Sequence, residues 1–335
     1  MFDDIRVPAT LIVELTNHCN LRCPLCTTHV AMKRPRGFME FALFARMIDE
    51  LKESRWSPDI SLNMCGEPLL HPEAPRFVGH AAGRGFRTYI STNVTRLSND
   101  LSEQLICAGL TAVALCVDGA SAASHEAYRV GSSFEAVRSN AEGFLAMRRR
   151  LGSGRPNVTI QTLLTRGSEG EMEQLLDWAW ETGADEVHFK SLSLGSTTSP
   201  AEKLQGSRLL PQNPLLRRDS AAPGHPCRYP DEHIMVYWNG ELGVCCIDFN
   251  NMAGLPGISG RGFLQSLSIP EVVAARRSGL QRQLAMCGPC QAVKTGFRGL
   301  TILFDLLREG SPRRPCWREL LEARIEEVKA QNEAR

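Results

Sequence analysis

Short apolar runs alternate with amphipathic stretches over the first two-thirds of the chain. The apolar runs are rich in Val, Ile, Leu and Thr, which is typical of buried parallel strands. We expect strands at Thr10–Leu15, Ile60–Met64, Phe86–Ser91, Ala112–Val117, Val158–Leu163 and Glu186–Phe189. The intervening periodicity predicts helices at Glu40–Glu53, Ala74–Ala82, Asp100–Ala108, Phe134–Leu151 and Glu169–Trp180. Repeated βα units of this kind indicate an α/β sheet or barrel with its chemistry at the carboxyl ends of the strands.

The alternation stops after Lys190. Residues 191–226 are rich in Ser, Pro, Gly and Leu without periodicity, and we interpret them as a linker. The elements predicted beyond it are strands at His233–Trp238 and Glu241–Cys246, joined by an Asn239-Gly240 hairpin turn, and helices at Pro270–Leu284 and Trp317–Asn332. We therefore divide the chain into residues 1–190, the linker, a smaller unit over 227–316 and a C-terminal helix over 317–335.

Composition excludes some classes of protein. The 335 residues include 38 Lys or Arg and 37 Asp or Glu, a formal charge of +1, which argues against a nucleic-acid partner held by phosphate attraction. No apolar run approaches the roughly 18 residues of a membrane span, and the polar start Met1–Asp4 is not a signal peptide. We expect a cytoplasmic protein with no membrane partner. Its 12 cysteines then favour metal ligation or catalysis over disulfides. Arg148–Arg150 is interpreted as a solvated face.

Three cysteines follow the first predicted strand. Cys19, Cys23 and Cys26 fall where a βα loop is expected. Three thiolates on one loop can hold three corners of a [4Fe–4S] cluster and leave one iron open, as a catalytic site requires. A zinc site completed by His18 or His29 is the alternative, because the spacing of Cys and His does not fix the metal.

The Cys19-x3-Cys23-x2-Cys26 motif resembles the defining motif of the radical S-adenosylmethionine (SAM) superfamily. Three further segments, each at the end of a predicted strand, resemble SAM-binding segments of that family: Cys65-Gly66-Glu67-Pro68, Ser91-Thr92-Asn93 and Val117-Asp118-Gly119. The stretch His125–Phe134 is also similar. The resemblance covers roughly residues 9–190. Two positions depart from the family pattern: Leu25, where an aromatic residue is common, and Cys65, which replaces a glycine and is expected to be a small buried residue.

The resemblance implies a partial (β/α)6 TIM-like barrel that binds a [4Fe–4S] cluster and SAM. Gly66, Glu67 and Pro68 would contact the SAM amino group, Ser91 and Asn93 would lie near the ribose, and Asp118 would complete the cofactor-binding set. An electron from a donor such as flavodoxin or ferredoxin would cleave SAM. The 5′-deoxyadenosyl radical then abstracts hydrogen from an unactivated C–H bond.

A second set of cysteines lies in the smaller unit. Cys227, Cys245, Cys287 and Cys290 follow the spacing C-x12-G-x4-C, then C-x2-C. Taken alone, four cysteines around a hairpin suit a structural zinc ribbon equally well. Beside a radical SAM motif they resemble the auxiliary-cluster domain called SPASM. Because no cysteine lies between Cys290 and Cys316, the resemblance is to its shortened form, called twitch, with one fully ligated auxiliary [4Fe–4S] cluster.

The remaining cysteines are Cys65, Cys107, Cys116, Cys246 and Cys316. Cys107, in a predicted helix, is expected in the core, whereas Cys116 at the end of a strand is expected to face the barrel interior. Cys246 follows a cluster ligand, so its side chain should point away from that of Cys245. Cys246 is most simply a structural residue inherited from SPASM-like sequences. It is also our first candidate for a thiol that returns hydrogen to a substrate radical, ahead of Cys65 and Cys116. The role of Cys316 stays open.

The substrate is inferred by analogy only. Twitch-type relatives include enzymes that act on aminoglycosides and other sugars, so we expect hydrogen abstraction from a carbinol carbon of a carbohydrate-like molecule. Loss of an electron and a proton would give a ketone; return of hydrogen from a thiol would give an epimer, which the spare thiol favours slightly. Four acidic residues would suit a cationic amino sugar, although each is more simply a solvated or capping residue: Glu14, Asp118, Asp231 and Asp248.

Two other classes of function remain as alternatives. The chain would instead be a maturase for ribosomal peptides or a protein activator of the sulfatase-maturase kind. The short segment before Thr10 leaves no room for an N-terminal peptide-recognition domain, so a separate recognition protein would be needed. A zinc protein without radical chemistry is the other alternative.

Overall fold

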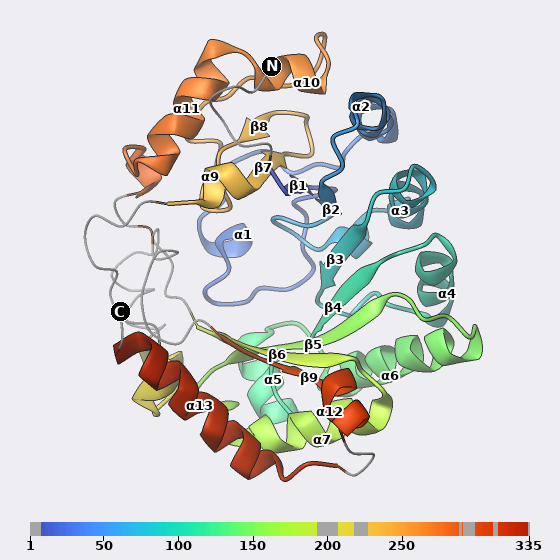
Figure 1. Cartoon of the computed structure of the whole chain (residues 1–335), viewed down its shortest axis with the longest axis vertical. Helices are drawn as coiled ribbons and strands as arrows, with labels where there is room; N and C mark the ends of the chain where they lie inside the picture. Colours follow the sequence, from blue (N-terminus) through green and yellow to red (C-terminus); the bar gives the residue numbers. More distant parts are fainter. Residues whose placement is uncertain are drawn as a thin grey trace.

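A curved sheet wrapped by helices forms the body of the computed structural model (Figure 1). The structure describes residues 8–192, 207–217, 227–287, 290, 299–310 and 314–333. Most of the predicted linker therefore lies outside the described residues. Within these ranges, no helix combines the length and apolar character that a membrane crossing demands.

Nine strands of the described residues form one sheet in the order β8-β7-β1-β2-β3-β4-β5-β6-β9. Pairing is parallel from β7 through β1 to β6, and antiparallel at both ends. The strands are β1 (Thr10–Val13), β2 (Asp59–Ser61), β3 (Thr88–Thr92), β4 (Ala112–Cys116), β5 (Asn157–Leu164), β6 (Glu186–Ser191), β7 (His233–Val236), β8 (Leu242–Gly243) and β9 (Gly299–Leu303). All six strands predicted for the first unit are present, and their parallel order confirms the partial barrel.

Helices cover the convex face of the sheet, whereas α1 lies within the arc that the strands describe (Figure 1). The α-helices are α1 (Thr27–Val30), α2 (Phe41–Ser54), α3 (Ala74–Gly83), α4 (Asn99–Cys107), α5 (Ala122–Tyr128), α6 (Phe134–Arg150), α7 (Met172–Thr182), α9 (Tyr229–Glu232), α10 (Phe263–Leu267), α11 (Pro270–Leu280), α12 (Phe304–Gly310) and α13 (Trp317–Glu333). Short 3₁₀ turns occur at Pro68–Leu70, Glu169–Glu171, Pro214–Leu216 and Ala285–Cys287.

Alternation along each strand separates an apolar core from a polar interior. On β5, Val158 and Ile160 face the helices and join the main core, so Gln161 between such positions faces the concave side. On β2 the regular strand is shorter than predicted, because the side chain of Asn63, rather than a backbone group, accepts the amide hydrogen bond of Ser91 at 3.2 Å. The concave face thus carries polar side chains near the carboxyl ends of the strands.

Strands from the segment 227–316 extend both edges of the barrel sheet. The predicted hairpin is confirmed: β7 pairs antiparallel with β8, and Asn239-Gly240 forms the turn. Its strand β7 also pairs in parallel with β1, while β9 pairs antiparallel with β6. The smaller unit is therefore continuous with the barrel through hydrogen-bonded strands, which fixes the position of its cysteines relative to β1.

Several expectations about exposure are wrong. Of the stretch Arg148–Arg150, Arg149 and Arg150 are exposed as predicted, but Arg148 is buried. Arg148 forms an ion pair with Asp185 and donates to the carbonyls of Pro156 and Gly183. Cys107 is exposed at the end of α4 rather than in the core. The helix predicted to reach Leu284 ends at Leu280, where the chain turns through Arg282 at φ +58°.

Candidate active site

The loop after β1 brings three thiols into one apolar surround. Cys23 is buried, and Cys19 and Cys26 are half-buried on either side of it. Leu21, Leu25, Tyr128 and Leu192 pack around them. Burial raises the pKa of Cys19 and raises that of Cys23 to about 12, so the free thiols hold their protons and a metal would have to displace them. Three thiols on one loop, one buried and two half-buried, could hold a [4Fe–4S] cluster with one iron open to a further ligand.

The segment Cys65–Pro68 is fixed directly onto this loop. Gly66 has φ +78°, and a Cβ atom there would lie 2.6 Å from the carbonyl oxygens of both Thr16 and His18. Its amide donates to the hydroxyl of Thr28 at 3.1 Å, and the amide of Glu67 donates to His18 O at 2.7 Å. Only glycine permits this approach. Cys65 is buried, as expected.

The carboxylate of Glu67 ties this segment to the end of β3. It is buried and accepts hydrogen bonds from Thr92 Oγ1 and the Asn93 amide, both at 2.7 Å, and from the Leu69 amide at 3.1 Å. Burial nevertheless raises its pKa. Because the carboxylate is used within the chain, Glu67 positions backbone groups, and Pro68 begins the short turn that follows.

Ser91 on β3 and Asn93 just after it, both residues of the predicted SAM site, face different neighbours. The side-chain amide of Asn93 donates to Asn20 Oδ1 at 3.0 Å and lies 3.9 Å from Cys19 Sγ, so it reaches the cysteine loop. The hydroxyl of Ser91 lies 3.3 Å from Cys116 Sγ on the concave face. Ser91 and Asn93 therefore connect the cysteine loop to the interior of the barrel.

Asp118 does not stand alone at the end of β4. It is buried, and it accepts hydrogen bonds from the guanidinium of Arg129 and, at 2.7 Å, from the amide of Leu163. Burial lowers the pKa of Arg129, but the negative charge of Asp118, together with smaller contributions from Cys116 and Cys23, outweighs this effect and raises the pKa well above its usual range. Sequence reasoning missed Arg129, which places a positive charge between the cysteine loop and the β4 end. Its only clue was its place in the His125–Phe134 stretch.

Of the four acidic residues, three are buried rather than solvated. Glu14 pairs with Arg34, and Asp118 with Arg129. Asp248 is fully buried, although it does cap a turn by accepting the amide of Ala253 at 3.4 Å and that of Met252. Asp231 is half-buried. Each of the three buried carboxylates has a structural partner, so these three are not freely solvated.

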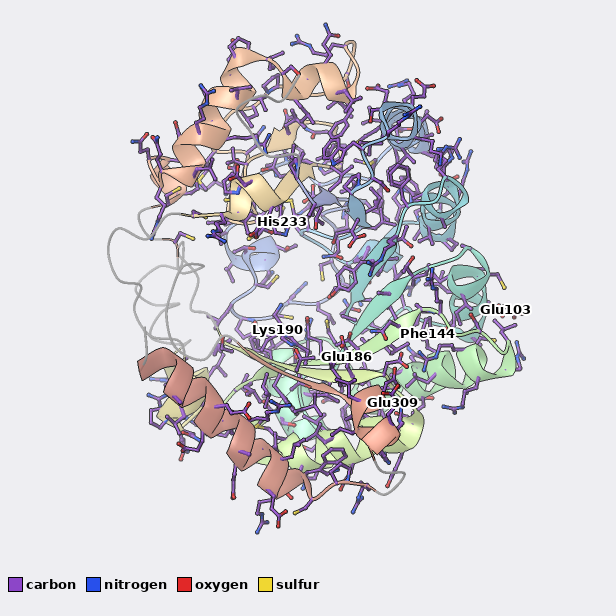
Figure 2. All side chains as sticks on the ribbon, viewed as in Figure 1. Glu103, Phe144, Glu186, Lys190, His233 and Glu309 are labelled. Atoms are coloured by element: carbon purple, nitrogen blue, oxygen red, sulfur yellow. The ribbon has the colours of Figure 1, made fainter. Side chains whose placement is uncertain are left out.

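The concave face carries a second polar group around Cys116. This thiol is buried and accepts a hydrogen bond from the side-chain amide of Gln161 at 3.2 Å, opposite its contact with Ser91. Burial raises the pKa of Cys116, which the positive charges of Arg129 and Lys190 partly offset. Lys190 and Glu186 lie on β6 beside this face (Figure 2). The prediction that Cys116 faces the barrel interior is confirmed.

The second set of cysteines lines one cavity. Cys227, Cys245, Cys287 and Cys290 come from before α9, after β8 and after α11, yet all four border the same small space, with Val244, Ile247, Leu284 and Met286 as apolar lining. Among the described residues, no three Cys, His, Asp or Glu side chains lie close enough to hold a single metal ion. Four cysteines that border one cavity could hold a [4Fe–4S] cluster.

Cys246 lies at the edge of this group. Cys246 is exposed and lies beside Tyr229, while Cys245 lines the cavity. Cys316 is exposed and lies before α13, away from the cavity lining.

A parallel partial barrel with three thiols on the loop after its first strand is the arrangement typical of enzymes that hold an iron–sulfur cluster and SAM at the carboxyl ends of the strands. The chain belongs to the Radical SAM superfamily, whose family model matches residues 13–179.

Among curated relatives, the chain is similar to a tungsten-containing aldehyde ferredoxin oxidoreductase cofactor-modifying protein of Pyrococcus furiosus, with 25% identity over 54% of this chain and 51% of the relative. It is also similar to a PqqA peptide cyclase of Streptomyces rochei, with 26% identity over 55% of this chain and 48% of the relative. The chain thus spans about half the length of these relatives.

Two solved structures share the fold. BtrN in complex with AdoMet and 2-DOIA has a TM-score of 0.55 and 17% identity, covering 88% of this chain and 96% of BtrN. Streptococcus suis SuiB bound to the precursor peptide SuiA has a TM-score of 0.61 and 14% identity, covering 82% of this chain and 68% of SuiB. Both likenesses extend well beyond residues 13–179.

Proposed function

We propose that this chain cleaves SAM at a [4Fe–4S] cluster held by Cys19, Cys23 and Cys26 and uses the radical to modify a peptide. One observation carries the proposal: the Gly66–Glu67 segment and Asn93, which resemble SAM-binding residues, are hydrogen-bonded to the loop that carries the three thiols. When bound, the cluster and SAM supply a 5′-deoxyadenosyl radical. A donor such as flavodoxin or ferredoxin would provide the electron.

The chain's own residues would hold and shield these groups. The apolar side chains of Leu21, Leu25 and Tyr128 exclude water from the thiols. Arg129, fixed by Asp118, places a positive charge near Cys23, which suits the negative charge that three thiolates bring. Ser91 and Gln161 present hydrogen-bonding groups on the concave face, where a substrate would meet the radical.

A peptide substrate has the support of two proteins similar to this chain. One is named a PqqA peptide cyclase, and the other, SuiB, is bound to a precursor peptide. Hydroxyl, amide and ammonium groups at Ser91, Gln161 and Lys190 match the donors and acceptors of a peptide backbone.

A carbohydrate-like small molecule is the second candidate. BtrN, bound to 2-DOIA, matches this chain over nearly its whole length, which favours a substrate of similar size. In that case a carbinol carbon would lose its hydrogen, and the product would be a ketone or an epimer. The ketone requires the substrate radical to give one electron to an acceptor and one proton to a base.

The four cysteines of the second cavity would hold an auxiliary [4Fe–4S] cluster that accepts this electron. Cys246, next to the cavity and beside Tyr229, would be the thiol that returns hydrogen when the outcome is epimerisation. Zinc bound without iron after anaerobic purification would contradict both clusters.

The test measures 5′-deoxyadenosine formed by reduced, reconstituted full-length protein from SAM in D2O. One series receives a mixture of synthetic peptides that together contain all common residues; a parallel series receives aminoglycosides and oligosaccharides. Formation above the substrate-free rate in the peptide series supports the main proposal, and formation only in the sugar series overturns it in favour of the second candidate. No SAM cleavage by protein with its full iron content would overturn the radical chemistry itself.

A further inference from the structure

Two loops that carry cysteines meet far from their positions in the sequence. The chain just after α1 bonds to the chain just after Cys246: the amide of Lys33 donates to Asn250 Oδ1 at 2.7 Å, and Asn250 Nδ2 donates to the carbonyl of Ala31 at 3.0 Å. Nε of Arg34 donates to the carbonyl of Phe249 at 2.7 Å. The segment that follows the Cys19–Cys26 loop and α1 is thus bonded to the segment that follows Cys246.

Arg34 is the centre of this junction. Its Nη2 donates to both carboxylate oxygens of Glu14, at 2.7 and 3.0 Å, and its guanidinium lies over the ring of Tyr237 with 4.1 Å to the centroid. Glu14 also accepts the amide of Trp238 at 3.2 Å. One buried ion pair therefore joins the end of β1, the loop after α1 and the β7–β8 hairpin.

Two buried polar atoms in the junction lack hydrogen-bond partners in the part of the chain that the structure describes, which is not expected of an ion pair that serves stability alone. Nη1 of Arg34 and Oδ2 of Asp248 are both buried and have no hydrogen-bond partner within the described ranges. A buried unsatisfied group lowers stability. Local violations of this kind are expected where a site is kept for function rather than for stability.

We propose that Arg34 is a positioning residue that fixes the loop of the SAM-binding thiols relative to the loop of the auxiliary-cluster thiols. This inference rests on the proposed function, because it assigns a cluster to each loop. Arg34 touches neither set of thiols. It acts through Glu14, Tyr237 and Phe249, and so sets the separation across which the two clusters interact.

The experiment compares Arg34→Met and Arg34→Lys with Arg148→Met in reconstituted full-length protein. Arg148 is a matched control, because it too is a buried arginine with a carboxylate partner and backbone acceptors, but it lies between α6 and β6. The readouts are iron content, the magnetic interaction between the two reduced clusters in the electron paramagnetic resonance spectrum, and hydrogen exchange of the amides of Lys33 and Trp238.

Arg34→Met should keep about eight irons, lose the magnetic interaction and exchange both amides at least about tenfold faster. Arg34→Lys should restore part of both signals, and Arg148→Met should change neither. An unchanged interaction and unchanged exchange in Arg34→Met would overturn the inference. About four irons in the unmutated protein would instead overturn the proposal that the chain holds two clusters. Hydrogen exchange in Arg34→Met would still test the junction separately, and unchanged exchange would overturn the role of Arg34 in it.

Discussion

The carboxylate of Glu67 accepts the backbone amide of Asn93 at 2.7 Å, which joins the segment after β2 to the end of β3. The other carboxylate oxygen accepts Thr92 Oγ1 and the amide of Leu69. All three partners are donors, so the site requires a group that only accepts. These three hydrogen bonds within the chain explain why position 67 is acidic, without any contact to SAM.

Glu67→Gln should therefore destabilise the fold, because its amide nitrogen would face a donor. We expect a loss of about 1–3 kcal/mol in the free energy of unfolding, with weaker SAM binding, measured by urea titration and equilibrium dialysis. Glu73→Gln is the control, since Glu73 forms an exposed pair with Arg76 and should cost less than about 0.5 kcal/mol. Equal effects of the two substitutions would contradict the role of Glu67.

Gly66→Ala should damage the cysteine loop specifically. The added Cβ would clash with two backbone carbonyls at a left-handed φ, so the loop must move. Iron content should fall from about eight to about four, because only the second set of thiols is undisturbed. Gly79→Ala in α3 has ordinary space around its Cβ and should stabilise the helix by about 0.5–1 kcal/mol without loss of iron.

Replacing Cys19, Cys23 and Cys26 together by Ala should leave about four irons of about eight, since each set of thiols would hold one cluster. Iron and sulfide analysis after anaerobic reconstitution measures this. A value near four for the unmutated protein would remove the auxiliary cluster.

Much of this site follows from sequence because its parts are local. The cysteine spacing places three thiols on one loop, and alternation along β4 places Cys116 on the concave face. The clustering of Cys227 with Cys245, Cys287 and Cys290 was predicted from a resemblance, and the four do share a cavity.

What the sequence could not predict depends on contacts between distant segments. Nothing in the composition of His233–Val236 distinguishes a free hairpin from a strand that also pairs with β1. The partners of Asp118 and Glu14 are arginines eleven and twenty residues away on loops, so no periodicity marks them. The helix α5 was missed because its capping box uses Ser121 and Ser124 instead of a glutamate.

Two of the three candidate thiols, Cys246 and Cys116, make different predictions for an epimerisation. Cys246→Ala should still cleave SAM but fail to return deuterium from D2O to the product, because the donor beside the auxiliary cavity is gone. Cys116→Ala should keep deuterium return if Cys246 is the donor. The exposed Cys107→Ala is the control for general loss of a thiol. Deuterium loss only in Cys116→Ala would move the donor to the barrel interior.

The pH dependence of stability should reflect His188, whose Nδ1 lies 2.6 Å from Thr301 Oγ1 across the β6–β9 pairing. Burial, and then the charge of Lys190, lower its pKa from 6.5 to about 4. Between these two pKa values the unfolded chain binds more protons than the folded one, so the free energy of unfolding rises with pH. The contribution of His188 to stability is therefore fully present above about pH 6.5 and is lost as the pH falls toward about 4.

Urea titrations at about pH 5.5 and 7.5 would isolate this contribution through His188→Gln. At the higher pH the histidine is neutral in both states, and the substitution costs only its contact with Thr301. At the lower pH the wild-type chain is less stable, because His188 takes up a proton when the chain unfolds. The glutamine of the variant does not titrate, so the difference in the free energy of unfolding between wild type and His188→Gln should be smaller at this pH. Lys190→Gln removes the second cause of the pKa shift and should weaken the pH dependence without abolishing it, because burial remains. A difference in the free energy of unfolding between wild type and His188→Gln that is the same at both pH values would contradict the lowered pKa of His188.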